Sequence, residues 1–334
     1  MNMAGKLMRA VQYYSYGGGV AGLKHVEVPV PAPKQDEVLI KLEAASINPV
    51  DWKIQKGELR PFLPPKFPFI PVTDVAGEVV ECGSGVKNFK AGDKVVTIHK
   101  LLSGGGLAEF CVAKGSQTVP RPPEVSPAEA AGIPVAALTA HLALTQSAGV
   151  KLDGSGPQKN ILVIAASGGV GHYAVQLAKL GNTHVTATCG ARNMELVKSL
   201  GADEVLDYKT PDGAALRSPS GKKYDAVVYG ATGIPWSTFE LNLSENGKVI
   251  DLEPGVSTMW TFALKKLTFA KKQMVPLYLR INSETQENLN NLVKLVKEGK
   301  LKTVVDSKYP LSKAEDAWAK SMDGHATGKI IVEP

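Results

Sequence analysis

A run of small residues between a predicted strand and a predicted helix carries the strongest chemical signal in the sequence. The apolar segment Ile161–Ala166 leads into Ser167-Gly168-Gly169-Val170-Gly171, and a helical pattern follows. Glycines let the backbone turn tightly and approach a diphosphate, and the first turn of a helix offers N–H groups with a partial positive charge. A tight turn without a ligand is the alternative. The strand before the glycines and the helix after them favour a dinucleotide-binding loop.

The segment after the next predicted strand indicates which dinucleotide is bound. An NAD site usually has an acid about 20 residues after the glycines, where it binds the ribose 2′-hydroxyl. Here the chain reads Gly190-Ala191-Arg192-Asn193, without an acid. Arg192 could pair with a 2′-phosphate through two N–H groups; the alternative is an exposed arginine at a helix start. We therefore expect NADPH as the cofactor, with Gly190, Arg192 and Asn193 contacting it.

A parallel sheet is expected behind these residues. From residue 158 onward, continuous apolar strands alternate with helices, which is typical of a doubly wound α/β sheet. The helices are predicted at Val170–Leu180 and Met194–Leu200. The strands are predicted at Asn160–Ala166, His184–Thr188, Glu204–Leu206, Ala226–Tyr229 and Lys248–Leu252.

The chain before this alternation is rich in proline and glycine and has short strands, which predicts a β-rich, barrel-like domain. Strands are expected at Leu7–Tyr14, Glu37–Glu43, Val79–Val80 and Lys94–Ile98. Three helix starts carry capping signals: Ser126-Pro127-Ala128-Glu129, Ser283 with Gln286, and Ser312 with Glu315. The last predicted strand, Lys329–Val332, is expected to return to the first domain. We therefore expect domains at 1–125, 126–275 and 276–334, the third completing the first.

Several motifs in order along the chain resemble the quinone oxidoreductases of the zinc-less medium-chain dehydrogenase/reductase superfamily. They are Asn48–Asp51, Pro71–Val86, Lys90–Val95, Ala166–Gly171, Ser199–Asp203 and Thr327–Val332. The resemblance implies a GroES-like catalytic domain made from both chain ends and a Rossmann domain that binds NADPH. One departure is Val72, because many relatives have glycine there and the backbone before Asp74 is then expected to differ.

The resemblance also implies chemistry without a metal. The zinc enzymes of the superfamily have cysteine where Asn48 lies and a His-Glu pair where Thr73-Asp74 lies. Neutral amide and hydroxyl groups are poor zinc ligands compared with thiolate and imidazole. Without a Lewis acid, the substrate must already be electrophilic, as quinones and α,β-unsaturated carbonyls are.

Roles for individual residues follow from the resemblance. Lys53 is expected at the reactive centre, contacting the cofactor ribose or the enolate that forms, and Asn48 is expected to donate a hydrogen bond near the nicotinamide or substrate carbonyl. A solvated lysine and a turn asparagine are the alternatives. No convincing general acid is present, so water is expected to protonate the enolate. Further cofactor contacts are expected at Thr139, Ser167, Gly168, Gly169, Val170, Tyr208, Leu252, Thr327 and Gly328.

Composition narrows the partners. The chain has 334 residues, 44% of them hydrophobic, a net charge of +6 and three scattered cysteines. This favours a globular enzyme in a reducing compartment and gives no basic, aromatic patch for nucleic acid. An apolar pocket could be lined by Trp52, Phe62, Phe67, Phe69, Trp260 and Phe262.

The segment Met259–Lys272 combines apolar residues with lysines. It is interpreted as part of a homodimer interface, with a membrane-surface helix as the alternative. The chain further resembles plant members of the family from the chloroplast envelope, through Ser15–Gly19, Asp51–Gly57, Arg60–Leu63 and Pro310–Trp318. This implies peripheral attachment to the inner envelope, with a cytoplasmic location as the alternative. Because the first predicted strand begins almost at the N-terminus, no cleavable transit peptide is expected.

Three functions are compatible with these features. The first is an NADPH-dependent reductase of α,β-unsaturated carbonyls, such as lipid-derived enones and related ketols. The second is an NADPH quinone reductase. The third is an NADPH-binding protein with little turnover. Lys53 favours the first of them, because plant enone reductases of the family often have lysine at this place.

Overall fold

The computed structural model describes residues 5–61 and 65–334. The chain forms two compact units. Unit 1 combines both ends of the chain, residues 1–136 and 281–334, and unit 2 comprises residues 137–280.

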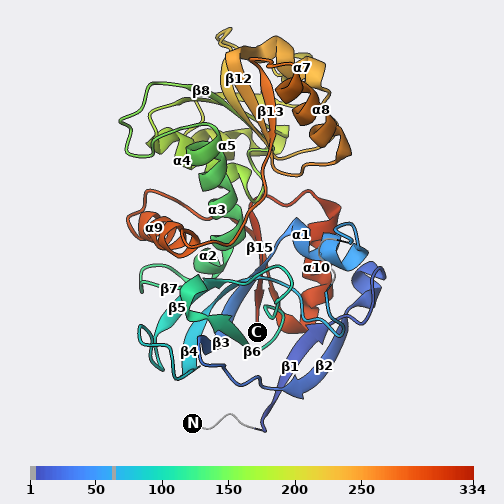
Figure 1. Ribbon diagram of the computed structural model, residues 1–334, viewed down its shortest axis with the longest axis vertical. Helices are drawn as coiled ribbons and strands as arrows, with labels where there is room; N and C mark the ends of the chain where they lie inside the picture. The colour runs from blue at the N-terminus through green and yellow to red at the C-terminus, as the bar shows by residue number, and fades with distance from the viewer. Residues whose placement is uncertain (1–4, 62–64) are drawn as a thin grey trace. The chain divides into compact units, whose positions relative to one another are not determined.

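Unit 1 is built on a seven-stranded sheet with the path β14-β15-β3-β4-β5-β7, in which β6 also pairs with β3. The long strand β3 (Glu37–Ile47) runs antiparallel to β4 (Asp74–Cys82), β6 (Phe110–Lys114) and β15 (Lys329–Glu333). The predicted C-terminal strand is therefore confirmed, and it lies beside β3 (Figure 1). The other strands are β1 (Leu7–Gln12), β2 (Lys24–Pro29), β5 (Lys94–Ile98), β7 (Thr118–Pro120) and β14 (Val305–Pro310).

The helices of unit 1 test the three predicted capping signals. The first is confirmed: α2 (Pro127–Gly132) follows Ser126, whose hydroxyl accepts from the Glu129 amide at 3.3 Å. The second is wrong, because α9 (Thr285–Lys297) is entered through a turn in which Asn282 Oδ1 accepts from the Glu284 amide at 3.0 Å. The third is also wrong, because Ser312 lies in a 3₁₀ turn before α10 (Ala314–Asp323). A neighbouring turn replaced the serine cap in both cases.

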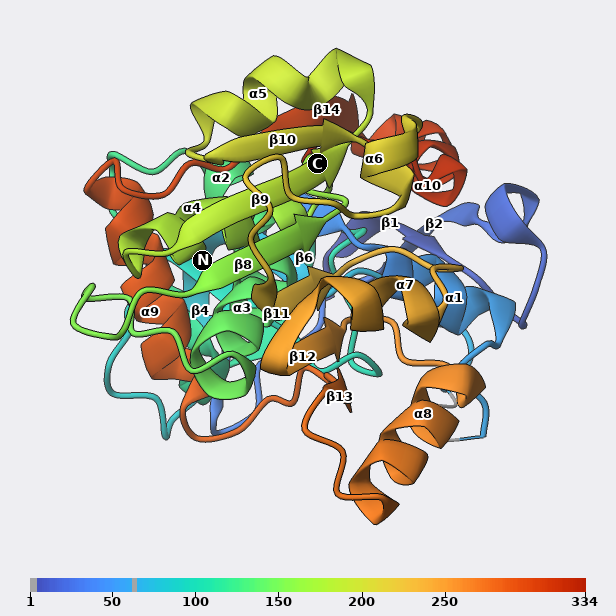
Figure 2. The ribbon, with the colours of Figure 1, turned by 90° about the horizontal axis from the view of Figure 1, so that it is seen from above.

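Unit 2 contains a six-stranded parallel sheet with the order β10-β9-β8-β11-β12-β13, as Figure 2 shows. This is the strand order of a Rossmann sheet, with its switch point between β8 and β11. The doubly wound prediction is confirmed, while β13 was not predicted because it is short and contains glutamine and proline. The strands are β8 (Asn160–Ile164), β9 (His184–Cys189), β10 (Glu204–Asp207), β11 (Tyr224–Tyr229), β12 (Leu243–Asp251) and β13 (Gln273–Pro276).

Helices connect these strands. In chain order they are α4 (Gly171–Leu180), α5 (Met194–Ser199), α6 (Pro211–Ala214), α7 (Trp236–Asn242) and α8 (Val256–Leu267). In unit 1, α1 (Pro49–Lys56) follows β3, and α3 (Pro134–Leu142) carries the chain from unit 1 into unit 2. Within residues 5–61 and 65–334, no helix has both the length and the apolar character needed to cross a membrane.

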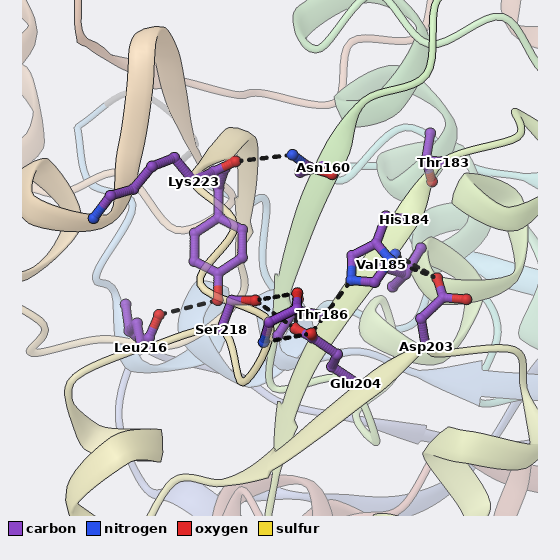
Figure 3. Close-up of polar contacts among 12 residues, drawn as sticks. Asn160, Thr183, His184, Val185, Thr186, Asp203, Glu204, Leu216, Ser218 and Lys223 are labelled. Atoms are coloured by element: carbon purple, nitrogen blue, oxygen red, sulfur yellow. Dashed lines mark hydrogen bonds and ion pairs between the residues drawn. The ribbon is translucent and has the colours of Figure 1, made fainter.

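A polar network joins β9 and β10 to the loop that follows α6 (Figure 3). The Glu204 carboxylate accepts from the Thr186 hydroxyl at 2.8 Å, the Ser218 hydroxyl at 2.7 Å and the Ser220 amide at 3.0 Å. Burial works to raise the pKa of Glu204, but these hydrogen bonds outweigh it and lower the pKa to about 2. The carboxylate therefore stays ionised and connects β10 to β9 and to the loop after α6.

Candidate functional site

The predicted dinucleotide loop lies at the carboxyl end of β8. The strand ends at Ile164 because Ala165 takes a φ of +57°, and α4 begins at Gly171 after six intervening residues. A Cβ on Gly171 would lie 2.2 Å from the Ala165 carbonyl oxygen, so only glycine allows the helix to start this close to the strand. Ser167, Gly168, Gly169 and Val170 are partly exposed along this turn. The loop thus presents its backbone at a helix N-terminus.

The other predicted cofactor residues of unit 2 gather at the same edge of the sheet. Carboxyl ends of parallel strands share one edge, and Gly190, Tyr208 and Leu252 follow β9, β10 and β12 directly. Asn193 Nδ2 donates to the Ser167 hydroxyl at 3.0 Å, which connects the two loops. A Cβ on Gly190 would lie 3.5 Å from the Tyr208 ring, so the ring lies against the glycine.

Exposure at this edge suits an anionic ligand. Arg192 is exposed, and Tyr208 keeps 49% of its surface accessible although it is aromatic. Leu252 is half-buried, and its amide donates to the Tyr229 carbonyl at 3.1 Å. The edge therefore offers a backbone cradle, a guanidinium and an aromatic face, which together fit a phosphorylated dinucleotide.

The remaining predicted residues lie elsewhere in the fold. Thr139 is half-buried on α3, and Lys53 is half-buried on α1 with its Nζ 5.5 Å from the centre of the Trp52 ring. Thr327 donates its amide to Asp306 at 2.7 Å. Gly328 has a φ of +88°, and a Cβ there would lie 2.1 Å from the Val304 carbonyl oxygen, so backbone packing alone requires glycine.

The predicted aromatic pocket is not assembled within one unit. Phe67 and Phe69 contact Tyr13 in unit 1, whereas Trp260 and Phe262 are on α8 in unit 2. Trp260 is 74% exposed. Trp52 is also in unit 1, and Phe62 lies outside the described residues.

A buried polar cluster surrounds Asn48 in unit 1. The Lys329 ammonium donates to Asn48 Oδ1, and Asn48 Nδ2 donates to Asp74 Oδ2 at 2.9 Å and to the Ser46 carbonyl at 3.3 Å. The Asn48 backbone amide donates to Asp51 at 2.7 Å. Both amide hydrogens of the Asn48 side chain therefore already have acceptors. The predicted donation to a substrate carbonyl would require one of them to be given up.

Sequence reasoning missed Lys329 as a member of this cluster. The one available signal is a lysine at the start of the apolar strand Lys329-Ile-Ile-Val332. Lys329 and Asp51 are each 3% exposed, and Asp74 is completely buried. Burial raises the pKa of Asp51 to about 7 and that of Asp74 to about 6, and it lowers the pKa of Lys329.

Val72 is strained beside this cluster. Its φ is +75°, in the left-handed region that a β-branched residue rarely adopts. The backbone thus has a conformation typical of glycine although valine stands there; the expected difference from relatives with glycine stays a prediction. Gly106 leaves room for it, because a Cβ there would lie 2.7 Å from Val72 Cγ1. In this conformation the Val72 backbone amide donates a hydrogen bond to the Asp51 carboxylate.

The cysteine that lines a cavity of about 280 Å³ in unit 1 is not activated as a nucleophile. The cavity is lined in part by Cys111 and His99, whose Sγ and Nε2 are 3.5 Å apart. Burial raises the pKa of Cys111 to about 12 and lowers that of His99 to about 4. Both groups are neutral near pH 7, so a thiolate–imidazolium pair does not form.

Comparison with known proteins covers the whole chain. The family described as "Alcohol dehydrogenase GroES-like domain" matches residues 34–123, and the one described as "Zinc-binding dehydrogenase" matches residues 200–332. The chain is 74% identical to the "Chloroplast envelope quinone oxidoreductase homolog" of Arabidopsis thaliana, over 99% of this chain and 100% of the relative. The chain belongs to the medium-chain dehydrogenase/reductase superfamily, in its quinone oxidoreductase family.

Two further comparisons place the chain within the superfamily. It is 35% identical to the "NADPH-dependent alkenal/one oxidoreductase, chloroplastic" of Arabidopsis thaliana, over 98% of this chain and 80% of the relative. The structure of the quinone oxidoreductase from Coxiella burnetii superposes with a TM-score of 0.85 at 32% identity, over 98% of this chain and 100% of that one. The chain is therefore an oxidoreductase of this superfamily, with a GroES-like unit and a Rossmann-like unit.

The residues of this medium-chain oxidoreductase do not fit a zinc ion. Across residues 5–61 and 65–334, no three His, Cys, Asp or Glu side chains are placed to hold a metal. The resemblance places the zinc ligands of related enzymes at the positions of Asn48, Thr73 and Asp74, and here the Lys329 ammonium donates to Asn48. An ammonium at hydrogen-bond distance would repel a second cation. The edge of the unit 2 sheet, by contrast, fits a dinucleotide.

Proposed function

We propose that this chain is a zinc-independent, NADPH-dependent reductase of α,β-unsaturated carbonyls, such as lipid-derived enones and related ketols. The observation that carries the proposal is the carboxyl edge of the unit 2 sheet, where the glycine loop and the exposed Arg192 lie together without an acid in the segment Gly190–Asn193. The relative named as an NADPH-dependent alkenal/one oxidoreductase supports the same substrate class.

Each group in the proposal has a distinct task. NADPH, when bound, supplies the hydride. The loop Ser167–Val170 and the first turn of α4 hold the diphosphate, and Arg192 pairs with the 2′-phosphate. Tyr208 and Leu252 pack against the cofactor. Lys53 stabilises the negative charge that develops on the substrate oxygen, and water protonates the resulting enolate. The contacts of Thr139, Thr327 and Gly328 with the cofactor remain predictions.

The choice of substrate follows from the buried cluster. A simple ketone needs a Lewis acid or a strong proton donor to accept hydride, whereas an enone delocalises the charge as an enolate. The cluster around Asn48 contains Lys329, which donates to Asn48, instead of zinc ligands. Both amide hydrogens of the Asn48 side chain are already donated to acceptors within the protein. This unit is therefore suited to substrates that accept hydride without a Lewis acid, as enones do.

Quinone reduction is the second candidate, and a specific observation favours it. The chain is 74% identical to a protein named as a quinone oxidoreductase homologue, twice its identity to the alkenal/one oxidoreductase. Quinones need no Lewis acid either. An NADPH-binding protein with little turnover is the further alternative.

A comparison of substrates tests the proposal. NADPH oxidation is followed with a medium-chain alkenone and with a simple quinone, and both assays are repeated with NADH. We expect NADPH-specific turnover of the alkenone. In Lys53→Ala we expect kcat to fall about 10- to 100-fold, because the ammonium that stabilises the developing enolate is removed. Lys56→Ala is the matched control, because Lys56 lies on the same helix, exposed and paired with Glu58.

The remaining outcomes separate the alternatives. Turnover of the quinone alone would establish the second candidate. Binding of NADPH without turnover of either substrate would contradict both reductase proposals. Equal loss of activity in Lys56→Ala and Lys53→Ala would contradict the special role of Lys53.

We also propose a homodimer, with peripheral attachment to the inner chloroplast envelope as its location. The exposed apolar face of α8 supports an association surface. The names of the similar proteins from Arabidopsis thaliana support the envelope and the chloroplast.

A further inference from the structure

Two acids and one base lie together in the interior of unit 1. They come from separate elements: Asp51 from α1, Asp74 from the start of β4, and Lys329 from the start of β15. None exposes more than 3% of its surface. Buried ions cost several kcal/mol each unless they are paired and hydrogen-bonded, so the cluster needs its internal cation.

Asn48 connects the three charged side chains through hydrogen bonds. Lys329 can only donate, so it fixes the Asn48 oxygen toward β15 and the NH₂ group toward Asp74. A flipped amide would set NH₂ against ammonium and oxygen against carboxylate. Asp51 completes the arrangement by accepting from the Asn48 backbone amide at 2.7 Å, which closes the first turn of α1.

The backbone around the cluster is built to keep it in place. Val72 accepts a left-handed φ of +75°, and its amide is held by Asp51. The Val135 amide donates to both Asp74 oxygens, at 3.2 and 3.1 Å. Strain of this kind persists only where the surroundings determine the conformation. The cluster therefore links β15, β4 and the start of the helix that carries Lys53.

We infer that Lys329 is the resident cation of the catalytic unit. Its ammonium offsets part of the negative charge of the buried acids, and through Asn48 it positions the first turn of α1 and hence Lys53. The part of this inference that concerns turnover rests on the proposed reductase function. Lys329 contacts neither substrate nor cofactor in this role and is a positioning residue.

The pH dependence of stability distinguishes an electrostatic role of Lys329 from a role in packing alone. Lys329 favours the ionised forms of Asp51 and Asp74, while burial and their mutual repulsion oppose them. Tyr13 also faces Asp51, and burial raises its pKa, so its phenol stays protonated. An acid with a raised pKa stabilises the fold below its unfolded pKa and loses that contribution as the pH rises through the folded pKa. Without the cation, this loss is larger and extends to higher pH.

The test compares Lys329→Met with the matched control Lys308→Met, an exposed lysine of the neighbouring strand β14 that pairs with Glu333. The difference in Tm between wild type and Lys329→Met is expected to widen from pH 5.5 to pH 8. Hydrogen exchange of residues 48–57 should accelerate at least 10-fold at pH 7. In Lys329→Met/Asp74→Asn, which removes one acid with the cation, the Tm difference at pH 8 should narrow.

Turnover provides the third readout. Lys329→Met should lower kcat at least 10-fold while the Kd for NADPH, from fluorescence titration, stays within 3-fold of wild type. A Tm difference independent of pH, or unchanged exchange of residues 48–57, would overturn the inference. Wild-type protein that reduces neither alkenone nor quinone would instead defeat the proposed function, and the stability and exchange readouts would still decide the role of Lys329.

Discussion

At the scale of a single residue, we propose that Arg192 selects NADPH over NADH. It follows β9, is exposed, and lies in a segment that contains no acid. A charge-assisted pair with a 2′-phosphate contributes about 1.5–3 kcal/mol, which is about a 10- to 100-fold change in affinity. We expect Arg192→Ala to raise the Kd for NADPH by this factor and to leave the Kd for NADH unchanged, as measured by fluorescence titration.

The control for this prediction is Arg217→Ala. Arg217 is exposed on the same unit and pairs with Asp212 at 3.5 Å, so its removal changes net charge without touching the sheet edge. If Arg192→Ala and Arg217→Ala weaken NADPH binding equally, the effect is one of overall charge. If Arg192→Ala weakens NADH and NADPH equally, Arg192 does not contact the 2′-phosphate.

The sequence makes some site residues visible and hides others, for a physical reason. Ser167–Gly171 and Arg192 stand out because local rules govern a loop between a strand and a helix. Lys329 does not, because its partner Asn48 is 281 positions away and only β15 pairing with β3 brings them together. Without knowledge of the pairing between β15 and β3, a lysine at the start of an apolar strand is interpreted as a surface residue.

Gly171 sets the geometry of the loop at the scale of an element. The helix α4 begins so close to β8 that a Cβ there would lie 2.2 Å from the Ala165 oxygen and 2.7 Å from Ala166 Cα. Backbone atoms cannot move aside as a flexible side chain can, so Gly171→Ala should cost about 2–3 kcal/mol of stability. We expect lower stability in urea and at least 10-fold weaker NADPH binding.

Gly255→Ala is the matched control for this change. Gly255 precedes α8 with no atom within 4 Å of the Cβ position and without a left-handed φ. It should retain both stability and NADPH affinity. Wild-type NADPH affinity in Gly171→Ala would contradict the assignment of this loop to the diphosphate.

The elements themselves were predictable where one local signal dominates. Strand β5 was predicted with its observed bounds, and β8 differs only at its end, where Ala165 turns with a positive φ. Two helix starts were misplaced because Asn282 and the turn Leu311–Lys313 offered other ways to enter the helix. The strand β13 follows no periodic pattern over its four residues and depends on pairing with β12.

At the scale of the whole molecule, helix α8 gives unit 2 an exposed apolar face. The helix α8 exposes Val256, Met259, Trp260, Leu264 and Leu267, and Phe269 follows with 92% of its surface exposed. The spacing places these residues on one face, and contiguous apolar surface of this kind marks an association site. The neighbouring strand β13 ends the sheet, so a second copy could extend it.

The charges around this face favour a protein partner over an anionic membrane. Lys265 pairs with Glu240 at 2.9 Å, Lys271 pairs with Glu245, and Lys272 donates to the Glu240 carbonyl at 2.6 Å. Lys265 and Lys271 are each paired with a carboxylate, which reduces the net positive charge that this face offers to an anionic surface. We therefore expect a homodimer whose interface includes α8.

The double variant Trp260→Glu/Leu267→Glu tests the dimer, because it buries two charges in any apolar contact on this face. Light scattering after size exclusion should report a dimer for wild type and a monomer for the variant, with its Tm changed by only a few degrees because both residues are exposed. Leu7→Glu, 60% exposed on β1 of unit 1, should remain dimeric. A monomeric wild type that sediments with anionic vesicles, and no longer does so in the variant, would mean that α8 meets a membrane instead of a second copy.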